Sequence, residues 1–85
     1  MNYPKIIKVE PRDKMFLFVE FNNGDKKLLD VKPYVKLFKP FKELLDKKIF
    51  KQVRLDKLGR GLIWSKDIDL DGYDAWKYGK TIENE

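Results

Sequence analysis

The first third of the chain alternates between apolar and polar positions in a way that predicts β-strands. Residues 6–9 are rich in β-branched side chains, and we expect Pro11 to end this strand because proline cannot donate to a continuing ladder. Residues 15–21 carry apolar side chains on both faces, which predicts a central strand with one face against a helix and the other partly covered by a second element. Asn23-Gly24 then predicts a tight hairpin into a third strand over residues 26–31.

After the third strand the apolar spacing changes from two to three and four, which is typical of helix. A helical turn is expected over residues 34–38. The main helix is expected to begin at Pro40, which suits a first helical position, and to carry an apolar stripe of Phe41, Leu44 and Leu45.

The remainder of the chain predicts a second hairpin and a short terminal helix. Residues 53–55 and 62–64 are β-type runs on either side of a turn that contains glycine. Residues 67–72 read as a polar turn with Ile68 and Leu70 packed inward, after which Asp71 caps a helix that ends at Gly79.

These elements together predict the α+β class: a three-strand antiparallel meander, one or two short helices, a second β-hairpin and a C-terminal helical turn. We find no repeat or linker along the 85 residues, so we expect a single domain over 1–85. Its core is expected to span about 5–76, and residues 80–85 are expected to be a frayed tail.

Composition argues against most enzymes. The 85 residues contain no histidine and no cysteine, which removes imidazole acid–base catalysis, thiolate nucleophiles, disulfides and the common zinc sites. Ser65 is the only serine and Thr81 the only threonine, and the sequence has no histidine to act as the general base that would activate either hydroxyl as a nucleophile. We therefore expect no enzymatic activity and no cofactor. A small basic ribonuclease of the toxin type would be the exception, but such toxins generally begin with helices.

Alternating carboxylates in the C-terminal third resemble half of a calcium-binding loop. Asp67, Asp69 and Asp71 precede Gly72 with the spacing of the first half of such a loop. The second half fails, because Tyr78 stands where the bidentate glutamate is needed. A polar turn is the simpler interpretation, and whether these aspartates bind a cation stays open.

The charge balance permits a polyanion as a partner. Nineteen basic and fourteen acidic residues give a net charge of +5. Most lysines are spread along the chain, as on a solubilising surface, but the middle of the chain concentrates them. The candidate nucleic-acid patch consists of Lys36, Lys39, Lys42, Lys47, Lys48, Lys51 and Arg54.

Most aromatic residues fall on the apolar periods and are expected to fill the core. The pattern does not assign three aromatic residues near the C-terminus to the core. The candidate contacts with a protein partner are therefore Tyr73, Trp76 and Tyr78. We find no apolar run long enough to cross a membrane and no signal peptide, and we expect a cytoplasmic protein without a membrane partner.

The sequence resembles the domain-of-unknown-function family numbered 2442, which comprises small bacterial and archaeal proteins. The resemblance covers roughly residues 5–76, and the family's usual proline after the tryptophan is Ser65 here. It rests on Val9, Pro11, Phe16–Phe21, Asn23–Lys26, Leu29–Tyr34, Phe38, Phe41, Leu44, Phe50, Val53, Asp56, Gly59, Ile63, Trp64, Asp67, Asp69 and Leu70.

The resemblance implies the same meander, helix and second hairpin, and it supplies no catalytic or ligand residues because none is established for the family. It also implies that members are often encoded beside a second small protein in a toxin–antitoxin-like arrangement. We therefore expect a non-enzymatic protein-interaction module, whose partner is another small protein. The alternative is a nucleic-acid-binding domain that uses the lysine-rich face, and homodimerisation through a strand edge is compatible with either.

Overall fold

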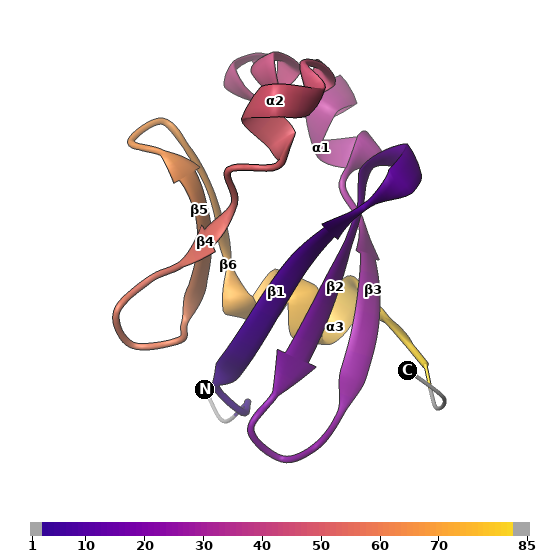
Figure 1. Cartoon of the computed structure of the whole chain (residues 1–85), viewed down its shortest axis with the longest axis vertical. Helices are drawn as coiled ribbons and strands as arrows, with labels where there is room; N and C mark the ends of the chain where they lie inside the picture. Colours follow the sequence, from indigo (N-terminus) through magenta and orange to yellow (C-terminus); the bar gives the residue numbers. More distant parts are fainter. Residues whose placement is uncertain (1–2, 83–85) are drawn as a thin grey trace.

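The computed structural model describes residues 3–82, which form two antiparallel sheets and several short helices (Figure 1). The first sheet has the order β1-β2-β3-β7 and the second the order β4-β5-β6. The strands of the first sheet are β1 (Ile6–Arg12), β2 (Phe16–Phe21), β3 (Lys26–Asp30) and β7 (Lys80–Thr81). Those of the second are β4 (Arg54–Leu55), β5 (Gly61–Ser65) and β6 (Ile68–Asp71). The α+β class predicted from the sequence is therefore confirmed.

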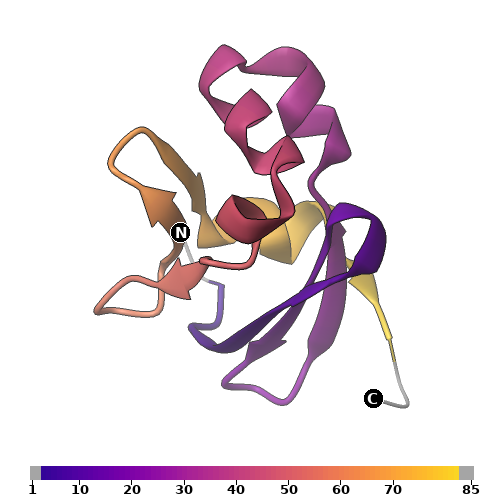
Figure 2. The ribbon, with the colours of Figure 1, turned by 45° about the horizontal axis from the view of Figure 1, so that its top comes forward.

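Along the chain, most of the helical segments come after β3 and before β4, where the second sheet begins. They are η1 (Asp13–Met15), α1 (Lys32–Leu37), η2 (Lys39–Leu45), α2 (Lys47–Phe50) and α3 (Gly72–Tyr78), where η denotes a 3-10 helix. We call residues 32–50, which contain α1, η2 and α2, the helical lobe. Figure 2 shows this lobe at one end of both sheets, with α3 crossing between the sheets.

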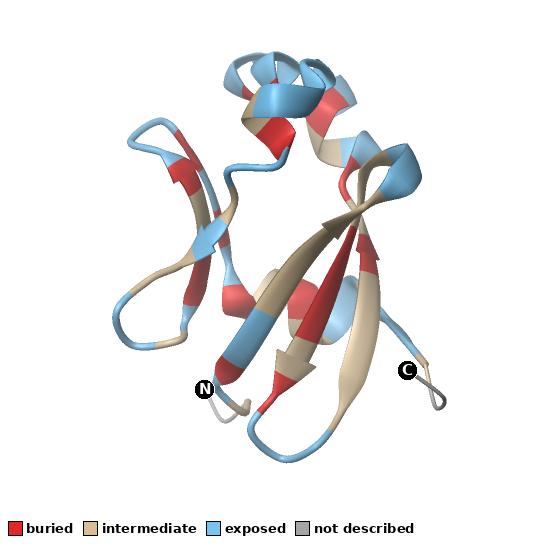
Figure 3. Ribbon diagram, viewed as in Figure 1, coloured by how far each residue is buried: buried red, intermediate tan, exposed pale blue. Residues whose placement is uncertain are grey.

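The core is built on the central strand β2 (Figure 3). Leu17, Val19 and Phe21 alternate along its inner face and are fully buried, as the sequence pattern predicts. Ala75 of α3 belongs to the same buried cluster, and Trp76 packs its ring edge-on against Phe21 with centroids 5.1 Å apart. One face of the central strand therefore lies against a helix, as expected.

The opposite face of β2 differs from the prediction, because cationic side chains cover it. Phe18 is buried outside the main core cluster, with the guanidinium of Arg12 4.8 Å from its ring centroid. The Lys32 ammonium lies 4.3 Å from the ring centroid of Phe16 in the same way. Long basic side chains cover apolar surface with their stems while their charges stay in water, so the face needs no further element.

Three strand boundaries also differ from the prediction. Strand β1 continues through Pro11 to Arg12, because β1 is an edge strand and proline, opposite Leu17, needs no ladder partner on its open side. Strand β2 begins at Phe16 rather than Met15, since Met15 has a positive φ of 65° and belongs to the preceding turn. The third strand was predicted to end at Val31 but ends at Asp30, because Val31 occupies the N-cap position of α1.

The predicted main helix is a 3-10 helix, and this changes which side chains it buries. Phe41 and Leu44 are buried, whereas Leu45, expected on the same stripe, is 65% exposed. A 3-10 helix has three residues per turn, so positions i and i+3 align and the next residue turns away. The helical period of 3.6 used for the prediction is therefore wrong for this segment.

The C-terminal part contains more strand than predicted. Residues 68–71 form strand β6 and turn the second hairpin into a three-stranded sheet, with Ile68 and Leu70 buried as expected. Asp71 caps α3 by accepting a hydrogen bond from the Tyr73 amide, as the sequence predicts. The predicted tail begins later than residue 80, because Lys80–Thr81 pairs with β3; residues 83–85 lie outside the described residues.

Candidate partner-binding site

The basic residues predicted as a patch all lie on or beside the helical lobe, and all are exposed. Within residues 3–82 none of them takes part in an ion pair. They are Lys36, Lys39, Lys42, Lys47, Lys48, Lys51 and Arg54.

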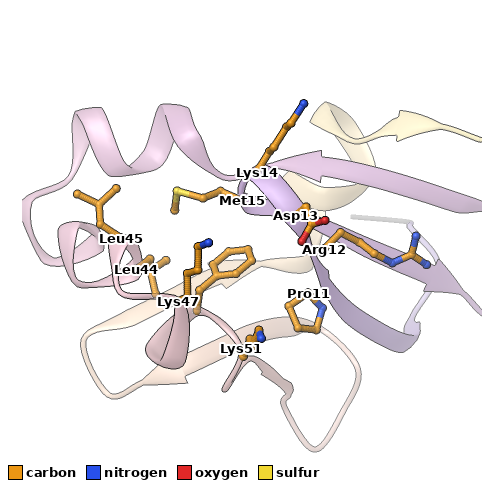
Figure 4. A pocket seen from close by; sticks show the side chains of 10 residues that line it. Pro11, Arg12, Asp13, Lys14, Met15, Leu44, Leu45, Lys47 and Lys51 are labelled. Atoms are coloured by element: carbon orange, nitrogen blue, oxygen red, sulfur yellow. The ribbon is translucent and has the colours of Figure 1, made fainter.

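A cavity of about 480 Å³ separates the helical lobe from the turn that joins β1 to β2 (Figure 4). It is large enough for one or two side chains of a partner. Its apolar lining comes from both sides, and its rim carries basic groups. The lining consists of Pro11, Arg12, Asp13, Lys14, Met15, Leu44, Leu45, Lys47, Phe50 and Lys51.

The side of the cavity formed by the β1–β2 turn has an unusual backbone. Lys14 and Met15 both adopt positive φ angles, 61° and 65°, although neither is glycine. Such a conformation costs about 1–2 kcal/mol per residue and persists only where neighbouring groups hold it. Here the Lys32 ammonium donates to the Lys14 carbonyl at 2.9 Å, and the Val31 amide donates to the Met15 carbonyl at 3.0 Å.

The charge that faces the cavity comes mainly from α2. The side chain of Lys47 extends toward the β1–β2 turn, whereas Lys14 and Arg12 point away from the other lining residues (Figure 4). Arg12 is also engaged elsewhere, since its guanidinium pairs with Glu10 at 3.0 Å. The hydrogen bonds from Arg12 and Lys8 lower the pKa of Glu10, which keeps this carboxylate charged and on the outer face of the sheet. Lys47 and Lys51 therefore supply the cations of the cavity.

Apolar side chains are exposed beside these lysines. In the helical lobe Leu37 is 73% exposed, Leu45 65% and Phe38 49%. Leu45 forms part of the cavity wall itself. The helical lobe therefore exposes apolar side chains beside ammonium groups.

The three aromatic residues predicted as partner contacts lie on α3 in different environments. Trp76 is half-buried against the core, with the Lys27 ammonium 4.1 Å from its ring centroid. Tyr73 is half-buried and lies 5.9 Å from the ring of Tyr3. Tyr78 is exposed at the end of the helix. The structure does not bring these rings together into one patch with the lysines.

Half of the cavity could not be found from sequence. Lys47 and Lys51 were predicted as part of a basic patch, but Leu45 was expected in the core. The β1–β2 turn carries no glycine and no motif, so nothing in the sequence indicates that Met15 faces the helical lobe. That juxtaposition follows from packing between segments about thirty residues apart.

Within residues 3–82, Asp67, Asp69 and Asp71 do not gather with other carboxylates into a metal-binding group. No helix among these residues has the length and apolarity needed to span a bilayer.

The structure is that of a small α+β domain whose cavity has apolar walls and basic side chains at its rim. The chain belongs to the family described as "Protein of unknown function (DUF2442)", whose model matches residues 6–72. This confirms the resemblance read from the sequence. No match was found among curated proteins or among solved structures.

Proposed function

We propose that this protein is a non-enzymatic, cytoplasmic protein-interaction module whose helical lobe binds an acidic segment of another small protein. The proposal rests chiefly on one observation: the wall of the cavity combines the exposed Leu45 with the ammonium groups of Lys47 and Lys51, which take part in no ion pair among residues 3–82. An apolar side chain of the partner would enter the cavity, and neighbouring carboxylates would meet the two lysines. Apolar anchors supply most of such binding energy, while complementary charge supplies speed and selectivity.

The small neighbouring protein that the family resemblance implies is the first partner to consider. A basic pocket fits a partner that is acidic at its contact surface. In a toxin–antitoxin-like pair, this chain would then supply the basic side of the interface.

Nucleic-acid binding is the second candidate, and the exposed lysines favour it. Single-stranded nucleic acids are usually held by aromatic rings that stack on bases. In the helical lobe Phe41 and Phe50 are buried, and the half-exposed Phe38 lines a second cavity together with Asp69, Asp71 and Asp74, whose negative charges repel phosphates. We therefore rank nucleic acid below a protein partner.

Charge reversal at the cavity is expected to weaken binding of an acidic peptide. We expect a short labelled peptide of alternating glutamate and leucine to bind the wild type with a Kd of about 100 μM or tighter. The double variant Lys47→Glu, Lys51→Glu should bind it at least about tenfold more weakly, because attraction at the rim becomes repulsion. Fluorescence anisotropy measures both affinities.

The matched control is Lys66→Glu, which reverses one exposed charge in the β5–β6 turn, away from the cavity lining. Its affinity should stay within about twofold of the wild type. A second peptide with serine in place of leucine should bind about tenfold more weakly, because it lacks the apolar anchor. Tighter binding of single-stranded DNA than of either peptide, with a steep salt dependence, would favour the nucleic-acid alternative instead.

A further inference from the structure

A second cavity, of about 320 Å³, lies on the other side of the helical lobe, between the lobe and the start of α3. Its lining differs in kind from that of the first cavity, between the helical lobe and the β1–β2 turn, which we call the basic cavity. One wall consists of aromatic rings and the other carries carboxylates. The lining residues are Tyr34, Phe38, Phe41, Asp69, Leu70, Asp71 and Asp74.

The aromatic wall is a cluster of three rings in mutual contact. The Tyr34 centroid lies 6.3 Å from Phe38 and 5.9 Å from Phe41, and in both pairs the rings are nearly parallel. Phe38 and Phe41 are 5.9 Å apart. Phe41 is buried, whereas Phe38 is about half exposed, so the wall reaches from the core to solvent. Burial and the charge of Asp74 raise the pKa of Tyr34 to about 12, so its phenol stays neutral at physiological pH.

The opposite wall carries carboxylates that take part in no ion pair within residues 3–82. Asp71 uses one carboxylate oxygen, Oδ1, to accept from the Tyr73 amide and the Tyr3 hydroxyl, both of which are neutral donors. Asp69 and Asp74 take part in no ion pair within residues 3–82. The charge of Lys77, one turn along α3, acts to lower the pKa of Asp74, and its ammonium lies over the rings of Tyr73 and Tyr78. In a chain of net charge +5, this lining contains three carboxylates and, among the described residues, no basic side chain.

The charge of Asp74 itself is expected to destabilise the fold. Burial and the charge of Asp71 raise the pKa of Asp74 above its ordinary value of 3.8. Because the folded state binds this proton more tightly, the destabilisation is absent below the unfolded pKa and grows as pH rises through the folded pKa. Asp74→Asn is therefore expected to show a higher urea midpoint than the wild type near pH 7, and an equal one near pH 3. A lower midpoint near pH 7 would contradict this expectation.

We propose that this aromatic groove, defined by the seven lining residues, receives an arginine side chain of a partner protein. A guanidinium is flat, so it can lie on the ring of Phe38 or Tyr34 while its N–H groups reach the carboxylates of Asp69 and Asp74. The groove thus offers the two features that arginine combines, a planar apolar face and a fork of donors. Neither feature depends on the basic cavity, so this proposal stands independently of the function proposed above.

Other cations match the groove less well. Within residues 3–82 the carboxylates do not converge as they would around a metal ion. A lysine ammonium is a compact point charge that keeps its water and makes poor use of a flat wall. A small free cation would leave the half-exposed Phe38 and the neighbouring Leu37, which is 73% exposed, uncovered. A protein partner covers both.

The test is a nuclear magnetic resonance titration of the labelled protein with the blocked peptide Gly-Arg-Gly and three matched probes. The probes are the same peptide with citrulline, the same peptide with lysine, and free methylguanidinium. We expect Gly-Arg-Gly to shift the amide signals of residues 69–74 with a Kd of about 1 mM. The other three should each bind at least about threefold more weakly. Equal binding of the citrulline peptide, of the lysine peptide or of methylguanidinium would overturn the proposal.

Variants of both walls identify the site. Phe38→Ala and Asp74→Asn should each weaken Gly-Arg-Gly about threefold to fivefold, since each removes one half of the recognition. The controls are Leu58→Ala, which removes an exposed leucine in the β4–β5 turn, and Asp67→Asn, which removes an exposed carboxylate; both residues lie outside the lining. Because Asp74→Asn is expected to keep or increase stability, its loss of binding would not reflect unfolding. Unchanged affinity in both wall variants would overturn the proposal.

Discussion

Replacing Trp64 with alanine is expected to lower the free energy of unfolding by about 4 kcal/mol. Trp64 on β5 is buried, stacks on Phe50 with centroids 6.1 Å apart and meets Phe41 edge-on at 6.2 Å. Its indole Nε1 donates to the Phe50 carbonyl at 2.9 Å. One side chain thus joins the second sheet to both η2 and α2, and its removal leaves a large cavity and an unpaired carbonyl. The loss is comparable with the whole stability of many domains of this size.

Urea unfolding followed by circular dichroism and by the fluorescence of the remaining Trp76 would measure this loss. Trp64→Phe separates the two contributions, because it keeps most of the ring packing and removes only the indole donor. We expect it to cost about 1.5 kcal/mol. A Trp64→Ala variant within about 1 kcal/mol of the wild type would mean that the helical lobe does not depend on this residue.

Replacing Gly59 with alanine is expected to cost about 3 kcal/mol, the second largest effect. Gly59 has a φ of +69°, and a Cβ there would lie 2.6 Å from the backbone oxygen of Ile6. The Ile6 amide donates to the Gly59 carbonyl at 2.8 Å, so this contact ties the β4–β5 turn to the first strand. The added methyl group would therefore introduce a strained φ and push the two sheets apart.

Gly24→Ala is the matched control for this second prediction. Gly24 also has a positive φ, +93°, but a Cβ there would meet nothing within 4 Å. Gly24→Ala should therefore lower the free energy of unfolding by only the cost of the strained φ, about 1 kcal/mol. The difference between the two urea midpoints isolates the contribution of the contact between sheets, and equal losses would show that this contact contributes little.

The strand meander was predictable from sequence because its signals are local. The alternation around Leu17, Val19 and Phe21 and the turn at Gly24 depend only on near neighbours in the chain. The exposure of Leu45 was not predictable, since it depends on whether the segment winds as a 3-10 or an α-helix. Strand β6 was missed for a similar reason, because its alternating aspartates are read as a turn until a neighbouring strand is known.

The candidate sites were predictable only in part, for a different physical reason. Lys47 and Lys51 could be assigned to a basic segment by counting charges. Their pairing with Met15 across a cavity, and that of Phe38 with Asp74 across another, depends on contacts between distant segments. Such contacts depend on the tertiary fold, about which residue spacing carries no information.

The proline in strand β1 bears on how this protein behaves at high concentration. An open strand edge presents a row of backbone donors and acceptors on which another copy of the chain can polymerise. Pro11 interrupts that row with a position that has no donor, and Ile6 already gives its amide to Gly59. Growth of fibres by strand addition is therefore disfavoured along β1, the longest edge strand among the described residues.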